Sequence, residues 1–127
     1  MKRFFATVFT LFTLVACQLN AVAGEKFDDA TFEAQLNAGG PVLVVAHAPW
    51  CPTCRAQQSA LKEIFTKATF NNFTYLVVDY DNQKDTLKKL NITRQSTLVL
   101  FKDGKEFSRN IGTTSTSAIE TILKKAL

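Results

Sequence analysis

The sequence predicts a single α/β domain, with a central mixed β-sheet and helices on both of its faces. Strand-like and helix-like segments alternate along the chain before two strands follow each other as a hairpin, an order that favours a sheet covered by helices. The chain has 127 residues, of which 46% are hydrophobic and 20% charged. This length and composition fit one globular domain with one core and leave no room for a second catalytic domain.

The first helix and the first buried strand are expected before the cysteine motif. A helix is predicted over residues 30–38, because Phe32 and Leu36 lie four residues apart on one face and a Gly-Gly-Pro sequence follows as cap and stop. Residues 42–46 form an uninterrupted apolar, β-branched run, which is typical of a strand buried on both faces of a sheet. This strand leads directly to the cysteines.

Three further elements follow the cysteines. A helix is expected from about Cys51 to Ala68, because its apolar residues recur at helical spacing. Residues 75–78 predict a second buried strand, and residues 83–90 a short amphipathic helix.

The last part of the chain predicts a hairpin and a helix. Residues 97–101 and 106–111 flank an Asp-Gly turn, which is a hairpin signal. Ser117 and Glu120 stand in a capping-box relation at the start of an amphipathic helix. In sheets of this class, sites form beyond the carboxyl ends of parallel strands, which is where Cys51 is expected.

The first 23 residues have the features of an export signal. Lys2 and Arg3 precede an apolar stretch, and a small-x-small pattern ends at Ala23. We therefore expect a signal peptide over residues 1–23 and a folded domain over residues 24–127. The apolar stretch is shorter than the ~20 residues needed to cross a bilayer, so a transmembrane helix is the weaker interpretation.

A second cleavage site competes with the first. Residues 14–17 resemble a bacterial lipobox, in which Cys17 would be lipidated after removal of a lipoprotein signal over residues 1–16. The cut after Ala23 is favoured because it falls at the start of the domain. Either cut leaves the domain two cysteines, three residues apart, which cannot form a disulfide scaffold.

The charge of the chain gives no reason to expect a nucleic-acid partner. Without Lys2 and Arg3 the formal charge falls by two, from +4 to +2. The lysines are dispersed, and no basic-aromatic interleaving occurs.

The motif around Cys51 and Cys54 carries the chemistry. A thiol attacks a disulfide as thiolate, which the unpaired N–H groups and the dipole of a helix N-terminus stabilise. Cys51 is expected at that position and Pro52 in the first turn, where a missing N–H costs nothing. Cys54 follows one turn along the same face. We therefore expect Cys51 to be an exposed nucleophile and Cys54 a more buried resolving thiol, with a redox-active Cys51–Cys54 disulfide.

A zinc half-site or two inert core cysteines are the structural alternatives. Zinc would need two further ligands, and the only histidine, His47, precedes Cys51 by four residues at a strand end. We expect no metal and no bound cofactor.

Four motifs together resemble the thioredoxin family over essentially all of Phe27 to Leu127: VLVV at 42–45, APWC at 48–51 with Cys54, TLVLFKDG at 97–104, and Gly112. The approach APWC is also similar to that of protein disulfide isomerase domains. The resemblance implies the thioredoxin fold and thiol-disulfide exchange with protein substrates. It also implies that substrates contact residues beside the cysteines and in the facing loop: Trp50, Pro52, Thr53, Gln95, Ser96 and Thr97.

Two departures from the family concern proton transfer. Thioredoxins usually have a buried aspartate six residues before the first cysteine, where this sequence has Val45. They often have a lysine near it on the next strand, which aligns with Val77. Proton transfer would then need water or another group, and His47 is the nearest titratable candidate in the sequence. The alternative for His47 is a strand-end residue with a satisfied hydrogen bond.

The third departure replaces the cis-proline of the family by Ser96. A cis bond before serine costs about 2.5 to 4 kcal/mol, so we predict a trans Gln95–Ser96 peptide. Ser96 also adds a backbone N–H and a hydroxyl beside the sulfurs. Substrate docking by strand-like pairing to this loop remains compatible with the change.

Three functions remain open. The favoured one is an exported, monomeric reductase in the periplasm, or anchored there as a lipoprotein, that receives electrons from a membrane thiol-electron transporter. A dithiol oxidase is suggested by Pro52, as in the oxidant family with Cys-Pro-His-Cys, but Thr53 cannot support the thiolate as a cationic histidine can. The third is a non-catalytic binding module that holds a partner or a soft metal.

Overall fold

The computed structural model describes residues 24–127. The expected signal peptide, the cleavage site and Cys17 lie outside the described residues. Within residues 24–127, none of the helices combines the length and the apolar character that crossing a membrane would require.

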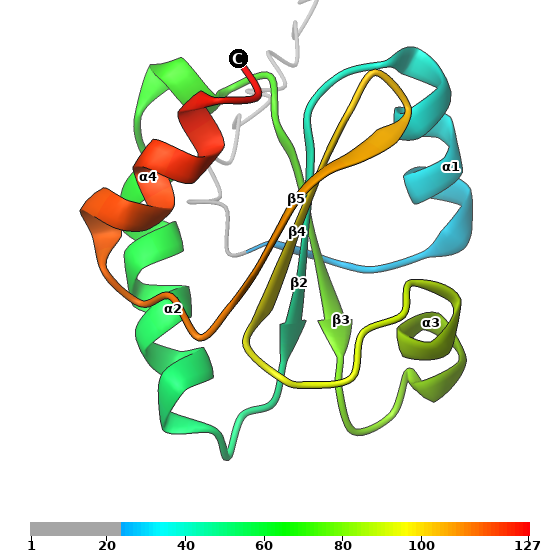
Figure 1. Cartoon of the computed structure of the whole chain (residues 1–127), viewed down its shortest axis with the longest axis vertical. Coiled ribbons are helices and arrows are strands. Elements are labelled where there is room, and N and C mark those ends of the chain that lie inside the picture. The colour runs from blue at the N-terminus through cyan, green and yellow to red at the C-terminus, as the bar shows by residue number, and fades with distance from the viewer. Residues whose placement is uncertain (1–23) are drawn as a thin grey trace, which may run out of the picture.

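Five strands form one mixed sheet in the order β1-β3-β2-β4-β5 (Figure 1). Strands β1, β3 and β2 are parallel, whereas β4 is antiparallel to β2, and β5 is antiparallel to β4. The strands are β1 (Glu25–Lys26), β2 (Val42–His47), β3 (Thr74–Asp79), β4 (Thr97–Lys102) and β5 (Lys105–Ile111).

Helices cover both faces of this sheet, which confirms the predicted fold class (Figure 1). Helices α1 and α3 lie on one face, and α2 and α4 lie on the other. The helices are α1 (Asp29–Ala38), α2 (Pro52–Ile64), α3 (Lys84–Lys89) and α4 (Thr116–Lys124), with a short 3-10 helix, η1 (Ala68–Phe70).

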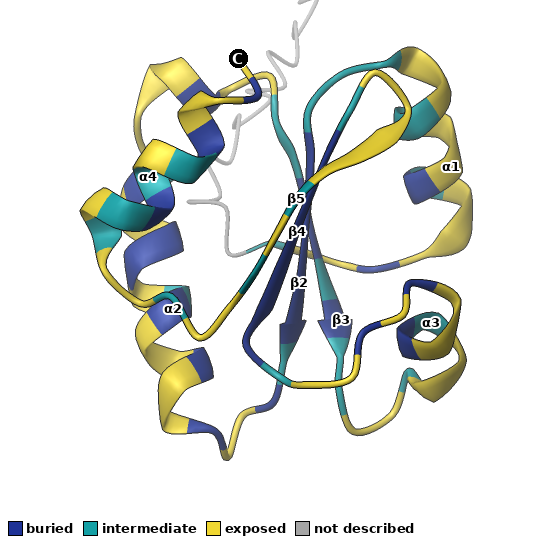
Figure 2. Ribbon diagram, in the orientation of Figure 1, coloured by how far each residue is buried: buried dark blue, intermediate teal, exposed yellow. Residues whose placement is uncertain are grey.

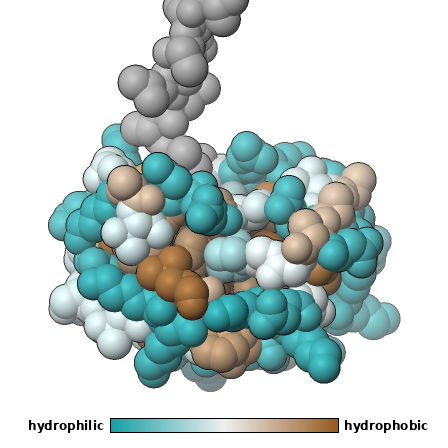
Figure 3. Space-filling model, turned by 90° about the horizontal axis from the view of Figure 1, so that it is seen from above, coloured by the Kyte–Doolittle hydropathy of each residue, from teal (hydrophilic) through white to brown (hydrophobic). Residues whose placement is uncertain are grey.

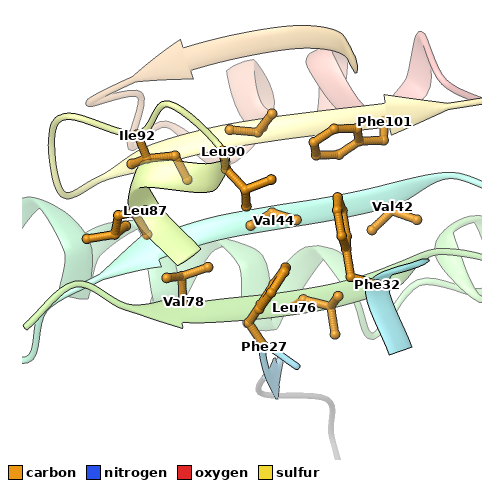
Figure 4. Close-up of a cluster of buried hydrophobic side chains, with 12 residues drawn as sticks. Phe27, Phe32, Val42, Val44, Leu76, Val78, Leu87, Leu90, Ile92 and Phe101 are labelled. Atoms are coloured by element: carbon orange, nitrogen blue, oxygen red, sulfur yellow. The ribbon is translucent and has the colours of Figure 1, made fainter. Parts of the chain in front are cut away.

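The central strand β2 separates two apolar clusters, because its successive side chains point to opposite faces. Val42 and Val44 pack with Phe32 of α1 on one side, where the Phe32 and Phe101 rings meet edge to face with centroids 5.1 Å apart (Figure 4). Leu43 and Val45 pack on the other side against α2 and α4. Figure 2 shows the resulting buried centre of the sheet. The expectation of a strand buried on both faces is confirmed.

The predicted end of the helix after the cysteines is wrong. Helix α2 ends at Ile64, and the Thr66 hydroxyl donates a hydrogen bond of 2.6 Å to the Glu63 carbonyl, at the point where the helix ends. Phe65 then stacks on Tyr75, with ring centroids 4.9 Å apart. Phe65 therefore continues the apolar pattern beyond the end of α2 because its ring packs on Tyr75. The helix itself does not extend that far.

The predicted capping box of the last helix is also wrong. Ser115 is the N-cap of α4, and its hydroxyl accepts a hydrogen bond from the Ala118 N–H. Ser117 lies inside the helix, and Glu120 forms ion pairs with Lys67 and Lys124 instead of returning to the cap. Two serines two residues apart offer alternative starts, and the hydrogen bond to the Ala118 N–H identifies Ser115 as the one used.

The cysteine motif lies at one particular end of the sheet. The carboxyl ends of β2 and β3, the start of α2 and the loop before β4 meet at the lower end of the view in Figure 1. The opposite end is shown in Figure 3, where the visible surface is largely hydrophilic and apolar residues occupy small separate areas. The cysteine motif therefore lies at the end where parallel strands of α/β sheets place their sites.

Candidate active site

Cys51 lies between the end of β2 and the start of α2. It is the N-cap residue of α2, in an extended conformation, and its sulfur accepts a hydrogen bond of 3.2 Å from the Cys54 N–H. Pro52 occupies the first helical turn, as predicted. The Cys51 sulfur therefore takes the place of a capping oxygen, where a negative charge is stabilised by unpaired N–H groups and by the helix dipole.

Both cysteines are free thiols and both are buried. Cys51 is 4% exposed and Cys54 is 1% exposed, so the expected order holds but the expectation of an exposed Cys51 is wrong. Cys51 is covered because it packs with Ala48, and because Ser96 lies against its sulfur. Access is provided by a cavity of about 290 Å³ that Cys51 lines.

Ser96 lies directly against both sulfurs. Its hydroxyl oxygen is 3.0 Å from Cys54 Sγ and 3.4 Å from Cys51 Sγ. No cis peptide bond occurs within residues 24–127, which confirms the predicted trans Gln95–Ser96 bond. The residue that replaces the cis-proline thus brings a polar group into contact with both thiols.

The backbone at Ser96 is strained and strongly held. Ser96 has a φ of 63°, a left-handed conformation that costs a non-glycine residue roughly 1–2 kcal/mol. Its N–H donates to the Ala46 carbonyl at 2.8 Å, and its carbonyl accepts from the Gly112 N–H at 3.0 Å. Strain of this kind persists only where the surroundings fix the conformation, and it occurs preferentially at functional sites.

Gln57 is a further support of this loop that the sequence interpretation missed. Its side chain is fully buried, and Nε2 donates 2.9 Å hydrogen bonds to the carbonyls of Ser96 and Thr113. The side chain therefore joins α2 to the loop before β4 and to the segment before α4. The available signal was a polar residue one turn after Cys54, among apolar positions of the same helix face.

The surroundings shift the two thiol pKa values in opposite directions. For Cys51, burial acts to raise the pKa, but hydrogen bonds from Cys54, from Ser96 and from backbone N–H groups outweigh burial and lower it. For Cys54, burial raises the pKa, and the interaction with Cys51 raises it further. One sulfur is therefore suited to be a thiolate while the other keeps its proton.

The valines at the family's charged positions lie side by side. Val45 and Val77 are register partners in the parallel pair β2 and β3. Val45 is buried and Val77 is half-buried, and both belong to the apolar cluster under α2 and α4. The side chains at these two positions therefore supply no carboxylate or ammonium for proton transfer, although Lys26, the register partner of Val77 in β1, and Asp79 line the same cavity as Val77.

His47 makes no hydrogen bond to either sulfur through which it could transfer a proton. Its Nδ1 is buried without a hydrogen-bond partner, so the interpretation as a satisfied strand-end residue is wrong for this atom. Burial lowers the pKa of His47, although Asp79 acts in the opposite direction. The ring lines a separate cavity of about 600 Å³, and no hydrogen bond joins it to either sulfur. The group that contacts the sulfurs is Ser96.

The expected substrate-contacting residues are only partly gathered. Thr53 and Gln95 line the cavity of about 290 Å³ together with Cys51 and Ser96. Trp50 is 58% exposed outside it, and its indole N–H donates to the Asp81 carboxylate at 3.0 Å.

Pro52 and Thr97 do not line that cavity. Pro52 is exposed in the first turn of α2, whereas Thr97 is buried and its hydroxyl donates to the Arg94 carbonyl at 2.7 Å. The side chain of Thr97 is thus engaged within the loop.

Three residues complete the cavity that the sequence interpretation did not assign: Arg94, Ile111 and Gly112. Ile111 reaches the site because it is the register partner of Thr97 in the β4–β5 pair. Arg94 lies two residues before Ser96, so its position in the loop could have indicated that it lines the cavity. Within the described part of the chain, no three His, Cys, Asp or Glu side chains are grouped as metal ligands would be.

We predict that Ser96→Ala raises the pKa of the Cys51 thiol, because a hydrogen-bond donor to the thiolate is lost. The rate of Cys51 alkylation by iodoacetamide, followed by mass spectrometry between pH 5 and 10, should fall several-fold at acidic and neutral pH. At pH values above both pKa values the two rates should converge. Superimposable pH profiles, or faster alkylation of Cys54 than of Cys51 in the unchanged protein, would contradict this account.

We also predict that Gln57→Met destabilises the protein by about 1–3 kcal/mol, because the Ser96 and Thr113 carbonyls lose their shared donor. Denaturant unfolding measures the change, and Ser59→Ala, at an exposed position of the same helix, serves as control. Amide exchange at Gly112 should accelerate in Gln57→Met alone. Unchanged exchange there would show that Gln57 does not hold the loop.

Comparison with known proteins identifies the family. The family model described as Thioredoxin matches residues 24–125. A thioredoxin of Mycobacterium bovis is 33% identical over 95 residues, which cover 74% of this chain and 81% of the relative. A thioredoxin of Rhodospirillum rubrum is 35% identical over 89 residues, covering 69% and 85%.

A solved structure shows the same arrangement. The crystal structure of Trxlp from Edwardsiella tarda EIB202 has a TM-score of 0.76 and 37% identity, and the match covers 78% of this chain and 96% of that one. The mixed sheet and the cysteine pair at the start of α2 lead to the same family as these relatives do. The chain therefore belongs to the thioredoxin family and is a thiol-disulfide oxidoreductase.

Proposed function

We propose that this protein is exported and reduces disulfides of extracytoplasmic proteins by dithiol exchange, with Cys51 as nucleophile and Cys54 as resolving thiol. The observation that carries the proposal is the opposite shift of the two thiol pKa values at one helix N-terminus. A lowered pKa supplies a thiolate for attack, and a raised pKa keeps the second thiol protonated until it is needed.

The exchange has two steps. The Cys51 thiolate attacks one sulfur of the substrate disulfide, a mixed disulfide forms, and the other substrate sulfur leaves as a thiolate that takes up a proton. Cys54 then loses its proton and attacks Cys51 Sγ, which forms the Cys51–Cys54 disulfide and releases the second substrate sulfur as a thiol. Two electrons pass from the protein dithiol to the substrate.

The loop before β4 supports docking of an extended substrate segment. The Ser96 N–H and carbonyl are used within the protein, by Ala46 and by Gly112 and Gln57. Gln95, in contrast, makes no backbone or side-chain hydrogen bond within residues 24–127 and lines the cavity beside Cys51. Its backbone can therefore pair with a substrate in the manner of an added strand, in the cavity that Thr53 also lines.

The direction of electron flow follows from what stabilises the Cys51 thiolate. The groups that lower its pKa are a thiol, a hydroxyl and backbone N–H groups, and none of them carries a charge. A cation would stabilise the thiolate more and make the protein a stronger oxidant. The neutral set therefore favours a reductase. A dithiol oxidase is the second candidate, favoured by the Ser96 hydroxyl, which adds a stabilising contact to both sulfurs.

Export is supported by the sequence of residues 1–23, with their basic start, apolar stretch and small-x-small end. An exported reductase needs a source of electrons outside the cytoplasm, and we propose a membrane thiol-electron transporter for this role. We propose that the mature protein acts as a periplasmic monomer. Lipidation at Cys17, which would anchor it to a membrane, is the alternative.

The proposed direction predicts a reducing potential. Residues 24–127, equilibrated with glutathione buffers and scored by mass-tagging of Cys51 and Cys54, should give a potential nearer the ~−270 mV of thioredoxin than the ~−120 mV of the strongest oxidants of this fold. A value near the oxidising end would favour the oxidase. The absence of any reversible couple would contradict both and leave a non-catalytic module.

The proposed location predicts that residues 1–23 suffice for export. Fused to a reporter that is active only outside the bacterial cytoplasm, they should give reporter activity, and replacing both Lys2 and Arg3 by Glu should reduce it. A Cys17→Ser variant separates the two cleavage sites, because it blocks lipidation but leaves the cut after Ala23. Loss of processing in Cys17→Ser would support the lipoprotein, and an inactive fusion would contradict export.

A further inference from the structure

The cavity beside Cys51 contains one charged side chain, Arg94. The other lining residues are Cys51, Thr53, Gln95, Ser96, Ile111 and Gly112, none of which carries a permanent charge. Arg94 is exposed, and its guanidinium makes no hydrogen bond and no ion pair within residues 24–127. A cation in this setting is available to a ligand that enters the cavity.

Arg109 shows what a structural arginine looks like in this protein. Its guanidinium forms an ion pair with Glu106 and donates to the carbonyls of Leu90 and Asn91. Arg94 has no comparable set of partners, although its backbone is fixed, because its carbonyl accepts the Thr97 hydroxyl. The backbone of Arg94 is therefore held beside the site, while its guanidinium is free to bind a ligand.

Arg94 is also not among the groups that shift the pKa of Cys51. Its charge is therefore available to act on groups that approach Cys51. Ile111, the last residue of β5, also lines the cavity and is 52% exposed. An incoming chain thus meets a cation and an aliphatic side chain in the cavity that the nucleophile lines.

From this arrangement we infer that Arg94 selects disulfides that have an acidic residue next to the attacked cysteine. The inference rests on the proposed function, because it assumes that Cys51 attacks protein disulfides. An aspartate or glutamate beside the substrate sulfur would pair with Arg94, while a lysine at the same position would be repelled. Such a pair is solvent-accessible, so its effect is modest and weakens as salt screens it.

The test uses three disulfide-bonded peptides that are identical except for Glu, Gln or Lys after the attacked cysteine. Second-order rate constants for their reduction by the protein are measured by stopped flow at low and high ionic strength. We expect the Glu peptide to react about two- to fivefold faster than the Gln peptide, and the Lys peptide to react more slowly. Added salt should compress these differences.

Variants assign the preference to Arg94. Arg94→Gln should remove the ranking of the three peptides, and Arg94→Glu should reverse it. Lys105→Gln is the matched control, because it removes one positive charge at the Asp-Gly turn, at the other end of the β4–β5 pair, and should keep the ranking. A ranking that persists in Arg94→Gln, or one that Lys105→Gln also removes, would overturn the role of Arg94.

The outcomes separate this inference from the function on which it rests. Equal rates for all three peptides with the unchanged protein would overturn the selection by charge and leave the reductase intact. No reduction of any of the peptides would contradict the proposed function itself.

Discussion

The site depends on the position of strand β2. This strand is buried along its length between β3 and β4, and its side chains supply both apolar clusters. Its pairing fixes where the chain leaves the sheet, so it fixes Cys51 four residues later. A shift of its register by one residue would exchange the two clusters, which is why the position is so strongly specified.

The same strand also holds the opposite side of the site. The Ala46 carbonyl accepts the Ser96 N–H at 2.8 Å, beyond the last residue pair of β2 and β4. This bond keeps the loop before β4 against the end of β2, and Gln57 ties the loop to α2. Thus the nucleophile and the hydroxyl that contacts it are held by one frame, and the strain at Ser96 is balanced by backbone bonds on both of its sides.

The fold could be predicted from the sequence because its elements carry strong local signals. The β-branched run of β2 and the Asp-Gly turn between β4 and β5 each have few alternatives. Element ends were less predictable, because they depend on tertiary packing or on competing caps. The Phe65 ring on Tyr75 extended the apolar pattern past α2, and Ser115 competed with Ser117 at α4.

Features of the site that depend on neighbouring residues in the sequence were predictable, whereas contacts between distant segments were not. The placement of Pro52 and the trans bond before Ser96 follow from local conformational rules. The contact of Ser96 with both sulfurs, the support from Gln57 and the charge of Arg94 in the cavity bring together residues about 40 apart in sequence or depend on loop shape. The burial of Cys51 has in part the same origin, because one of its covering groups, Ser96, comes from the loop before β4.

Ser96 alters the electrostatics of a site from which the family's charged pair has disappeared. With Val45 and Val77 facing each other, the interior beneath the sulfurs is apolar, and burial alone would raise both thiol pKa values. In such a medium a neutral hydrogen bond is electrostatically stronger than in water. The Ser96 hydroxyl, 3.0 and 3.4 Å from the two sulfurs, therefore acts to lower both thiol pKa values. The burial of Cys54 and the hydrogen bond between the two cysteines separate the two values, so that the Cys51 thiolate is favoured while Cys54 stays protonated. Among the side chains that act on these pKa values, none outside the cysteine pair carries a charge, and the position of the Ser96 hydroxyl depends on the strained loop.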